Sequence, residues 1–361
     1  MLLSLLVLVL YYLIMWQRLF AKVSPGIAID LGTANTLVYL KGQGLVFREP
    51  SVVARQRKSK KVLAVGTKAK KMIGKTPEAI EAFYPLHNGV IADFDAAEAM
   101  LAYYLNKVTE ENSFLRKFLK ETVIIGTPSG STEVERRAVF DAAIEAGAGN
   151  CFLVEEPMAA AIGADLPVDS PNGSLVCDIG GGTTEIAIIS LGGIVLNRSL
   201  KMAGHRMDEA IINFLRLKYS LLIGPSTAEE IKIEVGSALP QKKEPEMIVR
   251  GRGLEKGLPI TVKVIASEIR EAIAPILNQI IGTVNEMIEE APPELVNDFL
   301  ERGITLCGGG ANLPGIDQLF SQETKMPVFI AEDPQAAVAL GCGKLLEDVS
   351  LRDKVKIVGI N

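Results

Sequence analysis

The chain has 361 residues, of which 48% are hydrophobic and 22% are charged, and its formal net charge is −5. This length and composition indicate a folded protein with room for two domains, each with its own core. The mildly acidic balance gives no electrostatic reason to expect nucleic acid as a partner. Two histidines and four dispersed cysteines disfavour a zinc site or a histidine-based triad, so the thiols are expected to be reduced core residues.

Residues 1–23 form a distinct segment. Residues 1–16 are apolar apart from one serine, and the basic residues Arg18 and Lys22 follow. Sixteen helical residues reach about 24 Å, short of a hydrocarbon core of about 30 Å, but a snorkelling Arg18 could lengthen the span. We expect a membrane anchor whose trailing positive charge keeps the body of the protein in the cytoplasm. A later translation start, a signal peptide or a buried helix are the alternatives.

Beyond Pro25 the chain alternates strand-like and helix-like segments, which predicts an α/β fold. In chain order we expect strands over residues 27–31, 36–40 and 46–54, helices over 76–83 and 95–107, a strand over 122–126, a helix over 131–147, and strands over 175–179 and 185–191.

Five of the seven residues from 55 to 61 are basic. We interpret this run as the solvated tip of a hairpin between two apolar stretches, at 52–54 and 62–66. Contact with anionic lipid headgroups is the alternative if residues 1–23 hold the body of the protein at a membrane.

One pattern occurs twice: an apolar strand, Asp, Leu or Ile, Gly, three residues, Thr, and a second apolar strand. IAIDLGTANTLVYL places the aspartate at Asp30, and LVCDIGGGTTEIAII places it at Asp178. Each half of the chain begins with one copy, which predicts a duplicated domain with a cleft between the halves. Each turn joins strand to strand and lacks both G-K-[ST] and GxGxxG spacing, so neither is a P-loop or a dinucleotide fingerprint.

Glycine-containing turns can hold phosphate with bare backbone N–H groups, whereas an aspartate would repel phosphate. A nucleoside triphosphate arrives with Mg²⁺, which keeps several waters and takes one or two protein carboxylates. We therefore expect Asp30 and Asp178 to hold a hydrated Mg²⁺ through water. The phosphates would be bound by Gly32, Thr33, Ala34 and Asn35 from one turn and by Gly180, Gly181, Gly182, Thr183 and Thr184 from the other. The alternative is two tight hairpins in which each aspartate caps its own turn.

These turns resemble the phosphate-binding loops of the ATPase fold shared by actin, DnaK-type chaperones and hexokinase. Within that fold the chain resembles the bacterial actin MreB/Mbl family. The resemblance covers the chain from about residue 26 to 345, and it is carried by DLGTANTLVYLKGQG, REPSVVA, NGVIADF, VERRAVFDAA, EEPMAAAIGA, CDIGGGTTEIAIISLGGI, TAEEIKIEVGSA and GITLCGGGANLPGI.

The resemblance implies an actin-like ATPase fold with two duplicated lobes, each with a mixed five-stranded sheet flanked by helices, and a nucleotide cleft between them. Lobe I would span residues 24–170, with a small subdomain around 54–95. Lobe II would span 171–345, with a small subdomain around 205–265, and residues 346–361 would form a tail that returns to lobe I.

The resemblance also implies catalytic residues. Glu135, in TPSGSTEVERRAV, matches the family's catalytic position and would orient the water that attacks the γ-phosphate, together with Asp178. Thr132 to Glu135 also fits a T-x-x-E capping box, which is the structural alternative. Glu156, in EEPMAAA, is expected to lie behind the residues that touch the nucleotide, or to favour its helix start.

For the nucleoside, Glu229 and Lys232 in TAEEIK match the family's ribose and adenine pair, and a surface ion pair is the alternative. His205 stands where the family usually has an acid or an amide, and we expect it to be structural. The turn that resembles the adenosine-binding loop, where glycines let the backbone approach a flat base, comprises Gly308, Gly309, Gly310 and Asn312.

The function implied by the resemblance is that of a membrane-associated, ATP-dependent filament-forming cytoskeletal protein that maintains rod cell shape by organising cell-wall synthesis. Its cofactors would be ATP, with GTP possible, and Mg²⁺. Its partners would be further copies of itself in paired protofilaments, the cytoplasmic membrane and membrane-bound cell-wall morphogenesis proteins, with no nucleic acid. It would work in the cytoplasm at the inner face of the cell membrane. The alternatives are another bacterial actin, for division or segregation, and a small-molecule kinase of the same fold.

Overall fold

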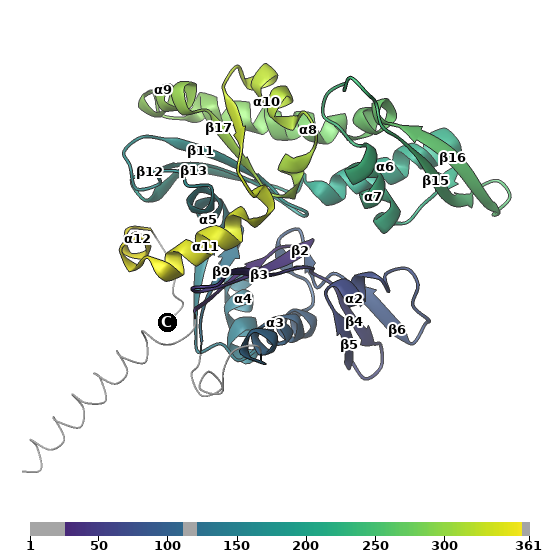
Figure 1. Cartoon of the computed structure of the whole chain (residues 1–361), viewed down its shortest axis with the longest axis horizontal. Helices are drawn as coiled ribbons and strands as arrows, with labels where there is room; N and C mark the ends of the chain where they lie inside the picture. The colour runs from purple at the N-terminus through teal and green to yellow at the C-terminus, as the bar shows by residue number, and fades with distance from the viewer. Residues whose placement is uncertain (1–25, 111–120, 356–361) are drawn as a thin grey trace, which may run out of the picture.

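The computed structural model describes residues 26–110 and 121–355, so the anchor expected at residues 1–23 lies outside it. No helix within the described ranges is long and apolar enough to cross a membrane. Two large sheets with helices on both faces make up the body of the molecule (Figure 1).

The first large sheet begins with a three-stranded antiparallel meander and continues with two parallel strands. Its strand order is β10-β9-β1-β2-β3. The strands are β1 (Gly26–Leu31), β2 (Asn35–Leu40), β3 (Gly44–Pro50), β9 (Thr122–Thr127) and β10 (Asn150–Glu155). Helices α3 (Phe94–Glu110) and α4 (Glu133–Glu145) bury apolar side chains against one face of this sheet.

The second large sheet repeats this connectivity, with the order β13-β12-β11-β17-β18. Its strands are β11 (Ser174–Ile179), β12 (Thr184–Ser190), β13 (Gly193–Leu200), β17 (Ile304–Cys307) and β18 (Val328–Ile330). Its outer face is covered by α8 (Ala266–Glu290), α9 (Pro293–Arg302) and α10 (Ile316–Thr324). Two five-stranded mixed sheets with the same strand order confirm the predicted duplication.

Helices α5 (Glu156–Gly163) and α11 (Ala337–Glu347) form a layer between the two large sheets (Figure 1). The two helices touch through their backbones: a Cβ on Gly163 would overlap the carbonyl of Ala337, and one on Gly341 would overlap the carbonyl of Ala159. Because both faces of each large sheet are covered, the central strands are apolar on both sides, as the buried run from Ile27 to Ile29 shows.

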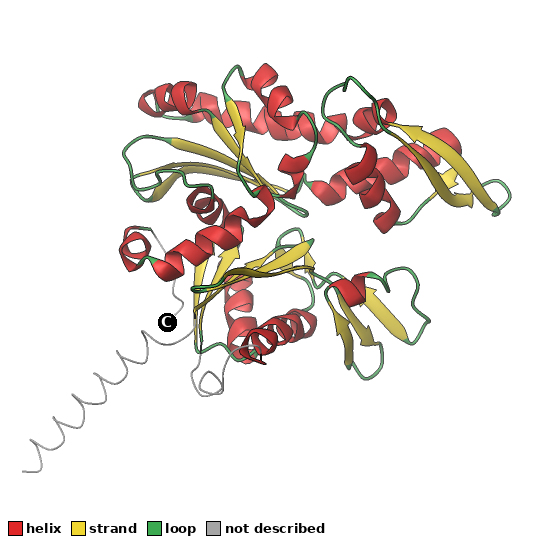
Figure 2. Ribbon diagram, in the orientation of Figure 1, coloured by secondary structure: helices red, strands yellow, loops and turns green. Residues whose placement is uncertain are grey.

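Each large sheet carries a smaller unit inserted at the corresponding point of the chain, and Figure 2 shows both units at the same end of the molecule. The first comprises β4 (Val53–Gln56), β5 (Val62–Val65), α2 (Thr67–Lys70) and β6 (Ile80–Phe83). The second comprises α6 (Gly204–Tyr219), β14 (Leu221–Leu222), α7 (Pro225–Val235), β15 (Glu246–Gly253) and β16 (Pro259–Ile265). The remaining short elements are β7 (Leu86–His87), β8 (Val90–Ile91), η2 (Gly309–Asn312), η3 (Pro334–Ala336) and α12 (Val349–Lys354).

Two expectations for the first small unit are wrong. Residues 76–83 were expected to form a helix, but residues 80–83 form β6, which pairs with β4. Thr76-Pro77-Glu78 has the composition of a helix start, yet pairing along the edge of β4 outweighs that local preference. The single strand expected over 46–54 is two strands, because Pro50 lacks a backbone donor and the chain passes there from the large sheet to the small one.

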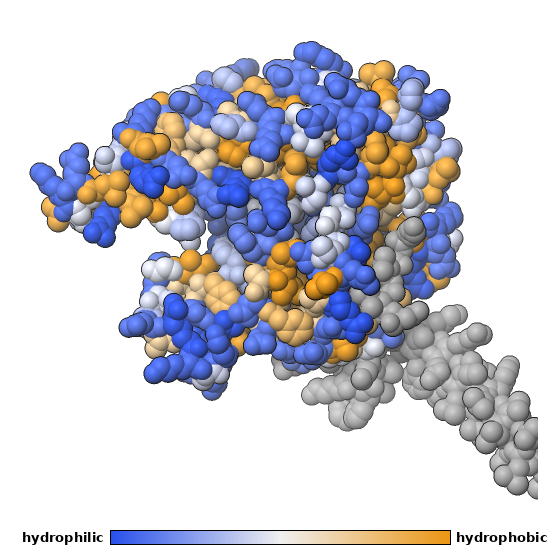
Figure 3. All heavy atoms as spheres, turned by 180° about the vertical axis from the view of Figure 1, so that it is seen from behind, coloured by the Kyte–Doolittle hydropathy of each residue, from blue (hydrophilic) through white to orange (hydrophobic). Residues whose placement is uncertain are grey.

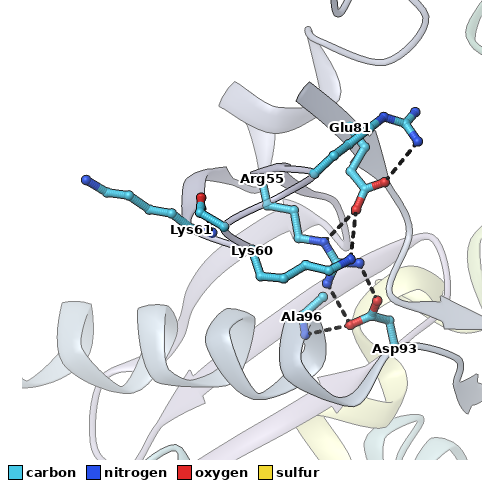
Figure 4. Close-up of polar contacts among 8 residues, drawn as sticks. Arg55, Lys60, Lys61, Glu81, Asp93 and Ala96 are labelled. Atoms are coloured by element: carbon cyan, nitrogen blue, oxygen red, sulfur yellow. Dashed lines mark hydrogen bonds and ion pairs between the residues drawn. The ribbon is translucent and has the colours of Figure 1, made fainter. Parts of the chain in front are cut away.

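The basic run at 55–61 lies on the β4–β5 hairpin, as predicted, but Arg55 is not part of a solvated tip. Arg55 is 6% exposed, and its guanidinium donates to Glu81 at 2.7 Å and to both carboxylate oxygens of Asp93 at 2.9 and 2.6 Å (Figure 4). Asp93 also accepts from the backbone N–H of Ala96 at the start of α3. Arg55 therefore joins the small sheet to a helix of the large unit.

Candidate functional site

A cavity of about 330 Å³ lies between the two duplicated hairpins and extends toward α7. The space-filling view from behind shows the hollow between the two small units on that side of the molecule (Figure 3). The cavity is lined by most residues that the sequence assigned to phosphate, metal and nucleoside: Asp30, Gly32, Thr33, Ala34, Asn35, Asp178, Gly180, Gly181, Gly182, Thr183, Glu229, Lys232, Gly308, Gly309, Gly310 and Asn312.

The two aspartates occupy equivalent positions at the ends of β1 and β11. Asp30 lies opposite Leu37 in the first hairpin, and Asp178 lies opposite Glu185 in the second. The second turn is fixed to the start of α6, because the carbonyls of Gly180 and Gly181 accept from the next helix at 3.1 and 2.8 Å. The duplicated strands thus present both carboxylates to one cavity.

The two glycine-containing turns lie in contact with each other. A Cβ on Gly181 would overlap the side chain of Ala34, and one on Gly182 would overlap Thr33. The hydroxyl of Thr33 accepts from the backbone N–H of Gly89 at 2.8 Å. Glycine is required here because a side chain would push the two turns apart.

The electrostatics of the cavity floor favour a bound cation. Burial raises the pKa of Asp30 to about 7. Burial, followed by the charges of Asp30 and Glu185, raises the pKa of Asp178 well above its ordinary value. A divalent cation between these carboxylates would offset their mutual repulsion and restore their ordinary acidity.

The donor set suits a hydrated ion. Carboxylate oxygens are ligands that Mg²⁺ accepts, and Mg²⁺ usually keeps several of its own waters. Within residues 26–110 and 121–355, no three Asp, Glu, His or Cys side chains converge to enclose a bare ion. Asp30 and Asp178 therefore fit an ion held partly or wholly through water.

Thr184, which was expected to bind phosphate, does not line this cavity. It is fully buried, and its hydroxyl donates to the carbonyl of Met202 at 2.6 Å. Its role in the structure is to fix β12 to the segment that precedes α6.

Glu135, which was expected to orient the attacking water, also lies outside the main cavity and borders a separate small one. Its carboxylate accepts from the backbone N–H of Thr132 at 2.7 Å, and its own N–H donates to the Thr132 hydroxyl at 3.2 Å. The backbone bond from Thr132, then its hydroxyl, lowers the pKa of Glu135. The capping box offered as the structural alternative is therefore present.

Glu156 does line the cavity, where the sequence had placed it only behind the binding residues. It is the first residue of α5, directly after β10, with Pro157 in the first helical turn, and it is 8% exposed. Burial raises its pKa well above the ordinary value, and the charges of Glu185, Asp30 and Asp178 raise it further. The Glu-Glu-Pro run between a strand and a helix was the feature of the sequence that could have indicated a carboxylate in the cavity.

At the other end of the cavity, Glu229 and Lys232 do not pair with each other. The carboxylate of Glu229 lies 2.7 Å from the ammonium of Lys70, on α2 of the opposite small unit. Lys232 lies 2.8 Å from Asp208 and donates to the carbonyl of Gly204 at 3.0 Å. Burial raises the pKa of Asp208 to about 6, although Lys232 opposes the shift. An ion pair thus crosses from one half of the molecule to the other, beside the end of the cavity where the nucleoside is expected.

The cavity also has a partly apolar wall, whose residues were not among those expected to bind the ligand. These residues come from segments far apart in the chain, so only their tertiary arrangement brings them together. They are Leu37, Met207, Ile233, Leu313, Pro314, Pro334 and Val338.

Comparison with known proteins identifies the family of this chain. A family model described as MreB/Mbl protein matches residues 24–354. The cell shape-determining protein MreB of Escherichia coli (strain K12) is 50% identical over 332 residues, which cover 91% of this chain and 95% of that protein. The cell shape-determining protein Mbl of Bacillus subtilis (strain 168) is 45% identical over 331 residues, covering 92% and 98%.

Solved structures agree with this result. MreB5 of Spiroplasma citri bound to ADP has a TM-score of 0.86 and 39% identity, covering 91% of this chain and 98% of that one. The MamK double helical filament, at 21% identity, has a TM-score of 0.76 and covers 90% and 99%, which supports the actin-like fold alone. The family resemblance and the fold class predicted from the sequence are confirmed. This chain belongs to the MreB/Mbl family of bacterial actins.

Proposed function

We propose that this chain is a nucleotide-dependent, filament-forming bacterial actin that determines cell shape. The observation that carries the proposal is the cavity, where two duplicated hairpins each contribute an aspartate and a glycine-containing turn. Relatives at 45–50% identity are named cell shape-determining proteins, and the MreB5 structures contain ADP or AMPPNP.

The nucleotide is ATP, with GTP as a possible second substrate. The backbone N–H groups of the two turns bind the phosphates, and the turn at Gly308–Asn312 lies against the base. Glu229 and Lys232 contact the ribose and adenine, and Glu229 keeps its ion pair with Lys70 through one carboxylate oxygen while the other faces the ligand.

Asp30 and Asp178 would hold Mg²⁺ through water. The bound ion would neutralise charge on the phosphate oxygens during transfer to water. The contribution of the chain is to bring both carboxylates to one cavity, at equivalent positions near the ends of β1 and β11.

We assign the water-orienting role to Glu156 instead of Glu135. The Glu156 carboxylate borders the same cavity as Asp30 and Asp178, whereas the Glu135 carboxylate is held by its own helix start. The raised pKa of Glu156 suits a group that takes up the proton of the attacking water.

Membership of the MreB/Mbl family supports self-association. In our proposal, copies of the chain associate into paired protofilaments, and residues 1–23, with their apolar run, attach them to the inner face of the cytoplasmic membrane. Membrane-bound cell-wall morphogenesis proteins are the further partners.

Sedimentation with Mg-ATP and anionic liposomes tests the assembly proposal. We expect polymer in the pellet, co-sedimenting with liposomes, and release of phosphate. Asp178→Asn should reduce phosphate release because it removes one of the two carboxylates. Protein that remains in the supernatant with every nucleotide would refute filament formation.

A matched pair of variants tests the catalytic assignment. Glu156→Gln should slow phosphate release by about 10²-fold or more, the range for loss of a general base, while ATP still binds. Glu135→Gln should leave the turnover number within a few fold of wild type. The reverse result would return the role to Glu135.

A further inference from the structure

The second hairpin contains a buried acid at a position where the first hairpin has a leucine. Glu185 is the second residue of β12 and is 1% exposed. It lies opposite Asp178, and the equivalent position of the first hairpin, opposite Asp30, is Leu37. A leucine satisfies the same hairpin in the first half, and burying a carboxylate carries a desolvation cost. This departure from the internal symmetry points to a role in the site.

The carboxylate of Glu185 is hydrogen-bonded to both halves of the molecule. One oxygen accepts from the backbone N–H and the hydroxyl of Ser129 at 3.2 and 2.6 Å. The other oxygen accepts from the hydroxyl of Ser199 on β13, its own sheet, at 2.5 Å. Ser129 belongs to the first half, between β9 and α4, so Glu185 bridges the two halves of the molecule.

The segment that Glu185 holds adjoins the proposed catalytic group. β9 pairs with β1 so that Gly126 lies beside Asp30, and a Cβ on Gly126 would stand 3.4 Å from the Cγ of Glu156. Glu185 itself directly follows the phosphate-binding turn of the second half, and its charge is the largest contribution after burial to the raised pKa of Glu156. The bridge therefore joins one phosphate turn to the wall that carries Glu156.

We propose that Glu185 is a positioning residue for nucleotide hydrolysis. It fixes the first-half segment at residues 127–131 against the second-half phosphate turn. The Glu156 carboxylate is thereby held at a fixed distance and orientation from the bound phosphates. This inference rests on the proposed ATP hydrolysis. Misplacement of a reacting group by about 1 Å can cost about 10²-fold in rate, which gives the effect its scale.

Steady-state hydrolysis by four variants, one of them a control, tests the kinetic part. Glu185→Ala should lower kcat by about 10²-fold with KM within about threefold of wild type, and Glu185→Gln, which still accepts hydrogen bonds, should recover part of the loss. Ser129→Ala should lower kcat and add little to Glu185→Ala, because the two residues share one interaction. Ser199→Ala is the matched control: it removes a bond within one half and should have the smaller effect.

Amide hydrogen exchange tests the bridge separately from hydrolysis. In nucleotide-free protein, Glu185→Ala should speed amide exchange at residues 129–131, within the held segment, and Ser199→Ala should speed it less. Wild-type protein that exchanges slowly there but does not hydrolyse ATP would refute the proposed function and leave the bridge intact. An unchanged kcat in folded Glu185→Ala, or a loss confined to KM, would overturn the positioning role. If Glu185→Ala fails to fold by circular dichroism, Ser129→Ala decides the question alone.

Discussion

Replacing Arg55 with methionine is expected to lower the stability of the protein, because it removes the ion pair that joins the small sheet β5-β4-β6 to the start of helix α3. The Arg55 side chain is 8% exposed, and its guanidinium forms ion pairs with both Glu81 and Asp93. The guanidinium also lies 4.6 Å from the ring centre of Phe83. Methionine keeps most of the apolar stem but leaves two carboxylates without their cation.

The structure sets the size of this effect. Removing one partner of a buried ion pair costs about 3–5 kcal/mol, because the remaining charge stays uncompensated. Glu81 and Asp93 are 21% and 28% exposed, so water replaces part of the lost interaction. We therefore expect Arg55→Met to lower the free energy of unfolding by about 3 kcal/mol, the lower end of that range.

Urea unfolding of nucleotide-free protein, followed by circular dichroism, measures this difference. Arg57→Met is the matched control on the same hairpin, because the Arg57 side chain is 58% exposed and stands 3.4 Å from Glu81. An exposed pair of this kind is worth about 1 kcal/mol or less. Equal losses for the two variants would refute the reasoning, since burial would then not matter.

The pH dependence supplies a second readout. Hydrogen bonds from Arg55 are the main cause that lowers the pKa of Asp93 below 3.8 and that of Glu81 below 4.5. A carboxyl whose pKa is lower in the folded state stabilises the fold above its unfolded pKa, and this contribution is lost as pH falls through the folded value. The difference in stability between wild type and Arg55→Met should therefore be largest near neutral pH and shrink in acid; a constant difference would contradict the assignment.

Three further predictions follow from the cavity and the core. Lys70→Ala removes the ion pair with Glu229 across the cavity mouth and should speed nucleotide release about two- to fivefold in stopped-flow exchange, the equivalent of about 0.5–1 kcal/mol. The control is Lys68→Ala, at an exposed position of the same helix, which should leave the release rate unchanged. Gly181→Ala should weaken nucleotide binding about tenfold in a fluorescence titration, because its Cβ forces the two turns apart, whereas Gly282→Ala, in open space on α8, should bind normally. Burial raises the thiol pKa values of the four cysteines, Cys151 (to about 12), Cys177, Cys307 and Cys342. A thiol reagent should therefore modify the native protein slowly and the urea-unfolded protein fast, and rapid labelling of the native protein would contradict this burial.

Much of this architecture was predictable from local sequence. The paired motifs around Asp30 and Asp178 indicated a duplicated α/β fold, because strand, turn and strand are each specified over a few neighbouring residues. The capping box at Thr132 was equally predictable, because it depends only on two side chains three residues apart in the sequence. The short segment at 76–83 was misread, because its local preference was weak and an edge of β4 decided its conformation.

The sequence by itself determined that two aspartate-bearing turns face a common cleft, but only the tertiary structure decided which other groups join them. Glu135 and Glu156 both stand near helix starts, yet the path of β9 and β10 brings only Glu156 to the main cavity. The contacts of Glu185 with Ser129 and of Lys70 with Glu229 join opposite halves of the molecule. Local patterns cannot encode such pairs, because the residues are far apart in the chain and meet only when the two sheets pack against the shared layer of α5 and α11.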